Sequence, residues 1–97
     1  MESVIFHPLA RQEMLDAARW YEEKRPGLGP CFIDAVDEAV TRLQKLPQMG
    51  RRLDSTYRRV LVRGFPYGVI YVVENDGLFV YAVMHLHREP NYWRDRD

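Results

Sequence analysis

The sequence has a single cysteine, no long apolar run and no excess of either charge. Cys31 is the only cysteine among 97 residues, so no disulfide can form within the chain. No apolar stretch approaches the roughly 20 residues needed to span a bilayer, and the first residues, MESVIFHPLARQE, lack a signal-peptide pattern. Fourteen basic side chains balance fourteen acidic ones. We therefore expect a cytoplasmic protein without membrane contact, in which Cys31 is a small core residue at a helix start.

The common signatures of catalysis and cofactor binding are also absent. The sequence has no glycine-rich phosphate-binding loop, no Cys/His spacing of a zinc site and no nucleophile elbow. His85 and His87 lie two residues apart on a predicted strand and so point the same way, but no third ligand is evident. We expect neither a metal nor another cofactor.

What is present is the composition of an ordinary globular domain. Hydrophobic residues make up 46% of the chain and charged residues 29%, values typical of a folded protein. A chain of this length suits one domain over residues 1–97, burying roughly 60 to 70% of the surface of the unfolded chain. Internal repeats, linkers and low-complexity segments are not evident.

Residues 57–88 form the centre of the predicted fold. Three short runs rich in Val, Ile, Tyr and Phe predict three strands, the first over residues 58–63. Asn75, Asp76 and Gly77 separate the second and third runs and favour a tight hairpin turn, because they tolerate positive φ. With the turn at the last two of these residues, three cross-strand pairs follow: Tyr71 with Ala82, Ile70 with Val83, and Val69 with Met84. Both faces of this hairpin are apolar, so we expect it to be covered.

The rest of the chain predicts that cover. Residues 3–7 indicate a short edge strand, and residues 9–24 and 31–46 carry apolar side chains at helical spacing. The predicted apolar stripes are Ala10, Met14, Ala17, Ala18 and Tyr21 in the first helix, and Phe32, Ala35, Val36, Ala39, Leu43 and Leu46 in the second. Pro30 is placed to begin the second helix, and residues 47–56 read as a loop. The predicted fold is α+β, with a two-helix hairpin on one face of a mostly antiparallel sheet of about four strands.

Positive charge gathers between residues 51 and 63. Five arginines stand there against Asp54 alone, namely Arg51, Arg52, Arg58, Arg59 and Arg63. On a strand, Arg59 and Arg63 would share one face, opposite the apolar side chains of Val60 and Val62. Such a patch can contact nucleic acid or an acidic protein, or simply keep a sheet edge from aggregating.

A second group of functional side chains follows the last predicted strand. It consists of His85, His87, Arg88, Tyr92 and Trp93. Histidine and tyrosine can move protons, and arginine can bind a phosphate or stabilise its transition-state charge. With aromatic rings to stack on bases, this combination suits single-stranded RNA. The same residues suit packing at the end of a sheet, with a charge on the surface, equally well.

The order of motifs resembles the RelE/ParE superfamily of bacterial type II toxins. The chain contains RWYEE and GLG in the helical hairpin, RRVLVRGFPYGVIY in the strands and the ending H..R.P..W. The resemblance spans Ile5 to Trp93 and implies a small α+β toxin, encoded beside a cognate antitoxin that wraps round it and silences it. RelE-like toxins cut messenger RNA on the ribosome, whereas characterised ParE toxins poison DNA gyrase.

Departures from the RelE pattern favour the ParE side. RelE-like ribonucleases carry an arginine directly after the tyrosine of the middle hairpin strand, where this chain has Gly68 after Tyr67. Their second arginine aligns with Leu86, and only their late tyrosine has a clear match, in Tyr92. A glycine cannot stabilise the charge of a pentavalent phosphorus. The resemblance therefore implies a growth inhibitor acting on DNA gyrase, as in plasmid-stabilisation systems, more than an enzyme.

The two toxin types assign different roles to the same residues. In a ribosome-dependent mRNA endoribonuclease, the catalytic residues would be His85, Arg88 and Tyr92. In a gyrase inhibitor, the target-binding residues would be Arg58, Arg59, Arg63, His87 and Trp93. For the antitoxin we expect an amphipathic helix or an added strand lying along the toxin. A non-toxic member of the fold that binds RNA or protein is a further alternative.

Overall fold

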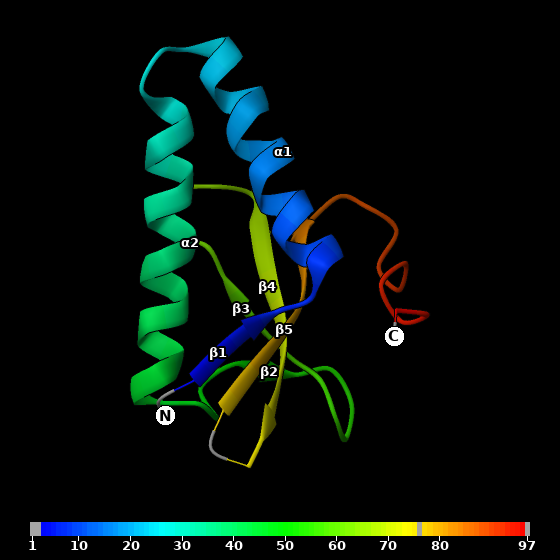
Figure 1. The fold of residues 1–97 in the computed structure, drawn as a ribbon. Coiled ribbons are helices and arrows are strands. Elements are labelled where there is room, and N and C mark those ends of the chain that lie inside the picture. The colour runs from blue at the N-terminus through cyan, green and yellow to red at the C-terminus, as the bar shows by residue number, and fades with distance from the viewer. Residues whose placement is uncertain (1–2, 76, 97) are drawn as a thin grey trace.

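The α+β fold is confirmed by the computed structural model, which describes residues 3–75 and 77–96. The elements within this part of the chain are β1 (Ser3–Phe6), α1 (Pro8–Lys24), α2 (Leu28–Lys45), β2 (Arg51–Arg52), β3 (Arg58–Leu61), β4 (Tyr67–Glu74) and β5 (Gly77–His85) (Figure 1). The two helices form an antiparallel hairpin whose tip extends beyond the sheet (Figure 1). Neither of these helices is long and apolar enough to cross a membrane.

The strands form one mixed sheet in the order β1-β5-β4-β3-β2. β1 pairs with β5 in parallel and, as predicted, lies at the edge, while the other neighbours are antiparallel. The sheet has one strand more than predicted, because Arg51 and Arg52 in the predicted loop 47–56 pair with Arg59 and Arg58. Two consecutive exposed arginines have no apolar alternation from which a strand could be predicted.

The predicted register of the central hairpin is wrong by two residues next to the turn and by one residue farther along. Tyr71 lies opposite Val80 instead of Ala82, because Glu74 already pairs with Gly77 and the turn comes one residue earlier than predicted. A β-bulge places an extra residue, Tyr81, in β5 and removes one residue of this shift, so Val69 lies opposite Val83 instead of Met84. The turn carries its positive φ at Asn75, with φ 49°. Gly77 is the first residue of β5 rather than a turn residue. The other predicted turn residue, Asp76, lies outside the described residues.

The helix boundaries depend on two caps that periodicity does not reveal. His7 precedes α1 and its Nδ1 accepts the Leu9 amide proton at 3.0 Å. At the start of α2 the Glu22 carboxylate accepts hydrogen bonds from the backbone amides of Gly27 and Gly29, each at 3.0 Å. Gly27 has a φ of 91°, which strongly favours glycine. These bonds explain why α2 begins before Pro30, within the RWYEE and GLG motifs.

Two predictions on α2 are wrong. Cys31 is exposed and is not a core residue, because the buried stripe of the helix passes through its neighbour Phe32 and through Val36. Leu46 lies just beyond the last turn and is 64% exposed. The other predicted stripe residues of both helices belong to the core or pack against it.

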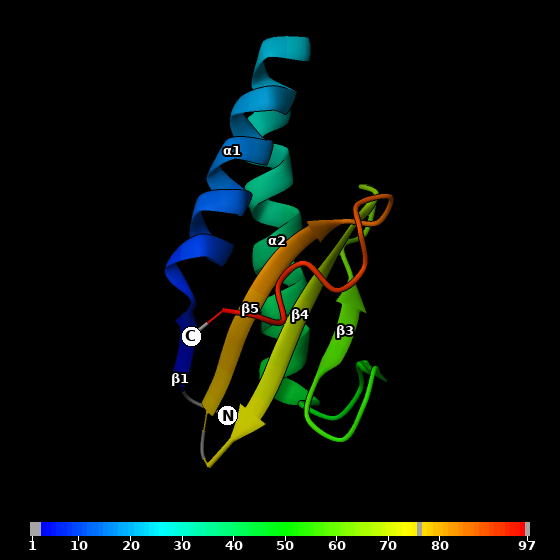
Figure 2. The same cartoon turned by 90° about the vertical axis from the view of Figure 1, so that its right-hand side faces the viewer.

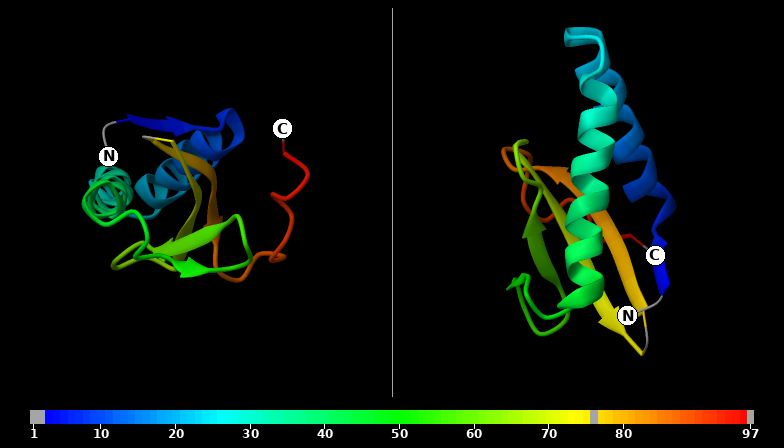
Figure 3. Two further views of the ribbon diagram at one scale, coloured as in Figure 1. Left: turned by 90° about the horizontal axis from the view of Figure 1, so that it is seen from below. Right: turned by 90° about the vertical axis from the view of Figure 1, so that its left-hand side faces the viewer.

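The sheet is covered on both faces, giving three layers (Figures 2 and 3). The helices cover one face, where the main core includes Phe32, Leu43 and Tyr71. Residues 86–96, which we call the C-terminal strap, cross the other face over β4 and β5 (Figure 2). There Trp93 is fully buried in a second core with Ile70, Ala82 and Met84. The expectation of an apolar hairpin covered by the rest of the chain is confirmed.

Candidate functional site

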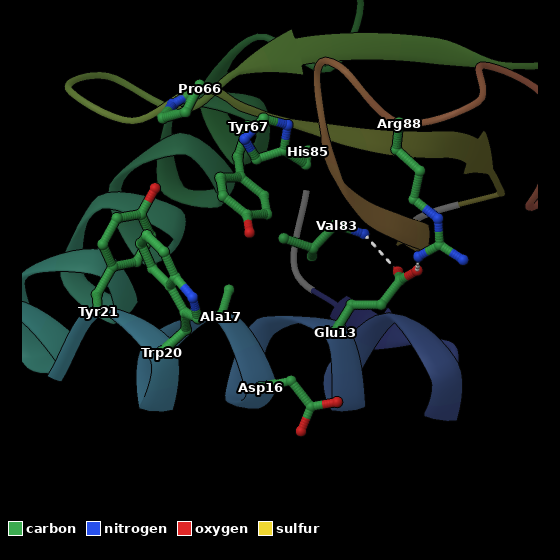
Figure 4. Close-up of a pocket in the computed structure, with 10 residues that line it drawn as sticks. All are labelled: Glu13, Asp16, Ala17, Trp20, Tyr21, Pro66, Tyr67, Val83, His85 and Arg88. Atoms are coloured by element: carbon green, nitrogen blue, oxygen red, sulfur yellow. Dashed lines mark hydrogen bonds and ion pairs between the residues drawn. The ribbon is translucent and has the colours of Figure 1, made fainter. Parts of the chain in front are cut away.

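A cleft of about 580 Å³ opens between α1 on one side and the start of β4 and the end of β5 on the other. β1 pairs with β5 only as far as Val80, and beyond this point α1 lies beside the strand and leaves the space open. The lining residues are Glu13, Asp16, Ala17, Trp20 and Tyr21 on α1, with Pro66, Tyr67, Val83, His85 and Arg88 opposite them (Figure 4). The sheet side chains of Tyr67 and Val83 point toward α1 across the cleft (Figure 4).

Glu13 is the centre of the polar contacts at one end of this cleft. Its Oε1 accepts the Val83 amide proton and a hydrogen bond from Arg96 Nη1, both at 3.0 Å. Its Oε2 accepts the Tyr92 hydroxyl proton and a bond from Arg96 Nη2, both at 2.6 Å. The side chains of Glu13 and Arg96 are only 14% and 9% exposed. This bidentate ion pair joins α1 to the strap.

Tyr92 and Arg88 are brought together by the same carboxylate. The Arg88 guanidinium lies 3.6 Å from the centroid of the Tyr92 ring, and its Nη1 is 3.5 Å from Glu13 Oε2. Burial, followed by the hydrogen bond to Glu13, raises the pKa of the Tyr92 hydroxyl well above its ordinary value. Tyr92 therefore keeps its proton, and the charge of Arg88 is partly compensated.

Of the two histidines, His85 lines the cleft at the end of β5. The His85 ring packs edge-on against Tyr67, with centroids 5.1 Å apart. Its Nδ1 accepts the His87 amide proton at 3.1 Å, so in the neutral ring the proton lies on Nε2. His87 is exposed. Among residues 3–75 and 77–96, no three His, Cys, Asp or Glu side chains are grouped so that they could hold a metal ion.

Gly68, at the position of the ribonuclease arginine, lies on the opposite face of the sheet. It pairs with Met84, which belongs to the core under the strap. A Cβ atom built on Gly68 would lie 3.0 Å from Arg59 Cδ and 3.4 Å from Leu86 Cδ2. The space that a larger side chain would need is thus filled, and this position faces away from the cleft that His85 and Arg88 line.

The predicted target-binding residues are dispersed. Arg58 donates hydrogen bonds to the carbonyl oxygens of Gln48 and Gly50, both at 2.9 Å, and so holds the loop before β2. Arg63 lies 3.6 Å from Glu38 of α2. The prediction that Arg59 and Arg63 share one face of a strand is wrong, because β3 ends at Leu61 and Arg63 is not part of the strand.

Trp93 is fully buried, with its Nε1 donating to Pro90 O at 3.1 Å. In this conformation its ring packs in the second core and touches no exposed surface. The roles assigned to all these residues remain predictions.

The sequence patterns do not predict Glu13 and Arg96 as site residues. Glu13 lies outside the predicted apolar stripe and has the appearance of an ordinary exposed helix residue. Its partners Val83 and Arg96 are 70 and 83 residues away. No local spacing joins such residues, and only the path of the strap brings them together.

The sequence matches a protein-family model over most of its length. A family model described as "ParE toxin of type II toxin-antitoxin system, parDE" matches residues 4–90. The chain belongs to this ParE toxin family. It is therefore the toxin component of a type II toxin-antitoxin system, and the predicted membership and toxin function are confirmed.

The solved structures agree on the fold. This ParE toxin is similar to a chain titled "Chromosomal ParDE TA system from P. aeruginosa", with a TM-score of 0.66 and 15% sequence identity. The match covers 90% of this toxin and 98% of that chain. No curated protein sequence matches the toxin. The family match ends at residue 90, so the Glu13–Arg96 pair involves a part of the ParE toxin beyond it.

Proposed function

We propose that this ParE toxin stops growth by binding DNA gyrase in the cytoplasm, without cutting RNA. Family membership supports the toxin role, and the resemblance to characterised ParE toxins supports gyrase as the target. The observation that carries the non-enzymatic part is the engagement of Tyr92 and Arg88 by Glu13. Gly68 supports it further, because it stands where RelE-like ribonucleases have an arginine.

Glu13 engages the side chains that RNA cleavage would require. An endoribonuclease needs a base for the 2′-hydroxyl, an acid for the leaving oxygen and cations around the phosphate. The Tyr92 hydroxyl already donates a hydrogen bond to Glu13, and the raised pKa of Tyr92 makes this hydroxyl a poor acid. The Glu13 carboxylate would also repel a phosphate placed beside Arg88. In a gyrase inhibitor these groups serve structure and binding, and no bond in RNA breaks.

Two assays with purified toxin test this proposal. With gyrase and plasmid DNA, we expect loss of supercoiling or trapped cleavage complexes. With translating ribosomes, we expect no codon-specific cuts in messenger RNA. Reproducible cuts that disappear in His85→Ala or Arg88→Ala would overturn the proposal and make the protein an enzyme. Induced expression that leaves both growth and supercoiling unchanged would instead indicate a non-toxic member of the family.

We further propose that the cognate antitoxin docks on the outer surface of the helical hairpin. Leu15 of α1 is a large apolar side chain that is 41% exposed on this surface. Leu15 also lines an apolar groove of about 450 Å³ that includes Ala18 and Ile33 on the two helices. An amphipathic antitoxin helix would cover these side chains.

Substitutions on this surface test the docking site. The toxin is co-expressed with the protein encoded by the neighbouring reading frame, and the affinity of the complex is measured by calorimetry. Leu15→Glu and Ile33→Glu, both in this groove, are expected to weaken the complex, whereas Leu61→Glu, at a 52% exposed residue of β3, should leave it unchanged. Equal affinities for all three variants would place the antitoxin elsewhere.

A further inference from the structure

Part of the positive charge between residues 51 and 63 is not used within the fold. Arg58 is bound to backbone carbonyls, and Arg63 lies beside Glu38. The other three arginines of the segment are Arg51, Arg52 and Arg59. Within the described ranges 3–75 and 77–96, no carboxylate forms an ion pair with any of these three. We call them the arginine patch.

The one acidic residue of the segment does not compensate the arginine patch. Asp54 Oδ1 accepts the amide protons of Thr56 and Tyr57, both at 2.8 Å, and so closes the turn between β2 and β3. Its Oδ2 lies 2.7 Å from Arg94 Nη1 of the strap. The carboxylate thus serves a turn and a different arginine. Among residues 3–75 and 77–96, the arginine patch therefore has no compensating carboxylate.

The strand register sets two members of the patch against each other. Arg51 of β2 lies directly opposite Arg59 of β3, and like charges in such a pair are destabilising. The Arg59 stem also packs over Gly68 and near Leu86, which restricts where its guanidinium can lie. An unfavourable pair held in place by packing is expected where an external anion compensates it.

The surroundings of the patch fit a polyanion better than a protein. The exposed large apolar side chains that flank the patch are Met49 and Leu61, which are 42% and 52% exposed. Two separate exposed side chains are ordinary surface features and do not form the apolar anchor on which a protein interface centres. β2 is only two residues long, so it offers little edge for an added acidic strand. Tyr57 packs against Trp93, with ring centroids 4.7 Å apart, and its face is not open for stacking on bases. Phosphates of a duplex backbone require neither anchors nor stacking.

We propose that Arg51, Arg52 and Arg59 bind the phosphate backbone of double-stranded DNA, independently of its sequence. Guanidinium groups suit this role because they bind phosphate oxygens in pairs and stay charged. Arg59 is also among the residues predicted to bind gyrase, but phosphate binding by the patch requires no contact with gyrase protein, so the site can exist whether or not gyrase is the target.

Binding of purified toxin to a short fluorescein-labelled DNA duplex, followed by anisotropy at increasing salt, tests this site. We expect binding at low salt, with log K falling against log salt at a slope of about −1.8 to −2.7 for two to three phosphate contacts. Arg51→Gln and Arg59→Gln should each reduce that slope by about 0.9. Arg51→Lys should keep most of it. The matched control is Arg25→Gln, at an exposed arginine near the tip of the helical hairpin.

Several outcomes would overturn the proposal. These are absence of binding at low salt, an equal loss in Arg25→Gln, and tighter binding of single-stranded RNA. Tighter binding of a polyglutamate peptide, lost in the same variants, would assign the patch to an acidic protein segment instead. Thermal unfolding followed by circular dichroism shows whether each variant is folded. The supercoiling assay on the same variants tests gyrase inhibition separately.

Discussion

The Glu13 carboxylate of α1 accepts a hydrogen bond from the Val83 amide of β5 at 3.0 Å. This amide lies beyond the point where β1 stops pairing with β5, so a helix side chain takes the place of a neighbouring strand. Arg96, paired with Glu13, donates to the carbonyl oxygen of Tyr81 at 2.7 Å on the same strand. An ion pair thus completes a sheet edge whose free backbone groups would otherwise invite pairing with another chain.

Removing the charge of Glu13 is expected to destabilise the toxin. Glu13→Gln keeps the size of the side chain but leaves the buried Arg96 guanidinium without its carboxylate. Loss of one partner from a buried ion pair costs about 3 kcal/mol, which urea unfolding can measure. Glu23→Gln, at an exposed position on the same helix, should change the free energy of unfolding by less than about 0.5 kcal/mol. Equal effects of the two substitutions would show that the Glu13–Arg96 pair is not structural.

Tyr92 gives the toxin a dependence on alkaline pH. Its folded-state pKa is raised above the ordinary value of 10.0, mainly by burial. The protonated hydroxyl therefore contributes stability that is present below pH 10 and is lost as the pH rises further. Tyr92→Phe should lower the free energy of unfolding at neutral pH by about 1 kcal/mol. Above pH 10, the free energy of unfolding of this variant should fall less steeply than that of the unmodified toxin. Tyr71, whose pKa is also raised by burial, is present in both proteins and therefore contributes equally to both pH profiles. Parallel pH profiles of the two proteins would contradict this account.

The fold could be predicted because its main signals are local. Apolar residues at helical spacing defined α1 and α2, and runs of β-branched and aromatic residues defined β3, β4 and β5. The register of β4 and β5 could not be predicted, since it depends on where the turn begins and on the bulge at Tyr81, and both depend on packing across the sheet. The strand at Arg51 and Arg52 forms only because β3 offers partners to it.

The candidate site shows the limit of sequence patterns more clearly. Arg88 and Tyr92 are correctly placed near each other, because they are only four positions apart in the sequence. Glu13 joins them from the other end of the chain, and no periodicity marks it. The target-binding role of Trp93 stays a prediction, but its complete burial could not be predicted, because no sequence pattern shows what covers a ring beyond the last strand. The strap itself provides that cover.

Asp54 gives a separate dependence on acid pH. Hydrogen bonds from the Tyr57 and Thr56 amides, and then Arg94, lower the pKa of its carboxyl from 3.8 to about 2. The ionised carboxylate contributes stability that is present above pH 3.8 and is lost as the pH falls to about 2. In thermal unfolding, Asp54→Asn should therefore show a smaller fall in Tm over this range than the unmodified toxin. Asp34→Asn, at an exposed residue of α2, serves as the control and should follow the unmodified toxin. Superimposable curves for all three proteins would contradict a role for Asp54.

Restoring the ribonuclease arginine at Gly68 should not create a ribonuclease. A side chain there meets Arg59 Cδ at 3.0 Å, so Gly68→Arg is expected to cost about 1 to 3 kcal/mol through overpacking. The double variant Gly68→Arg with Arg59→Ala makes room and should recover part of this loss in urea unfolding. Neither variant should cut messenger RNA on ribosomes, because this face of the sheet is turned away from His85, and the Tyr92 hydroxyl stays bound to Glu13. Cleavage by the double variant alone would show that a single missing cation, and not the engagement of Tyr92 by Glu13, prevents catalysis.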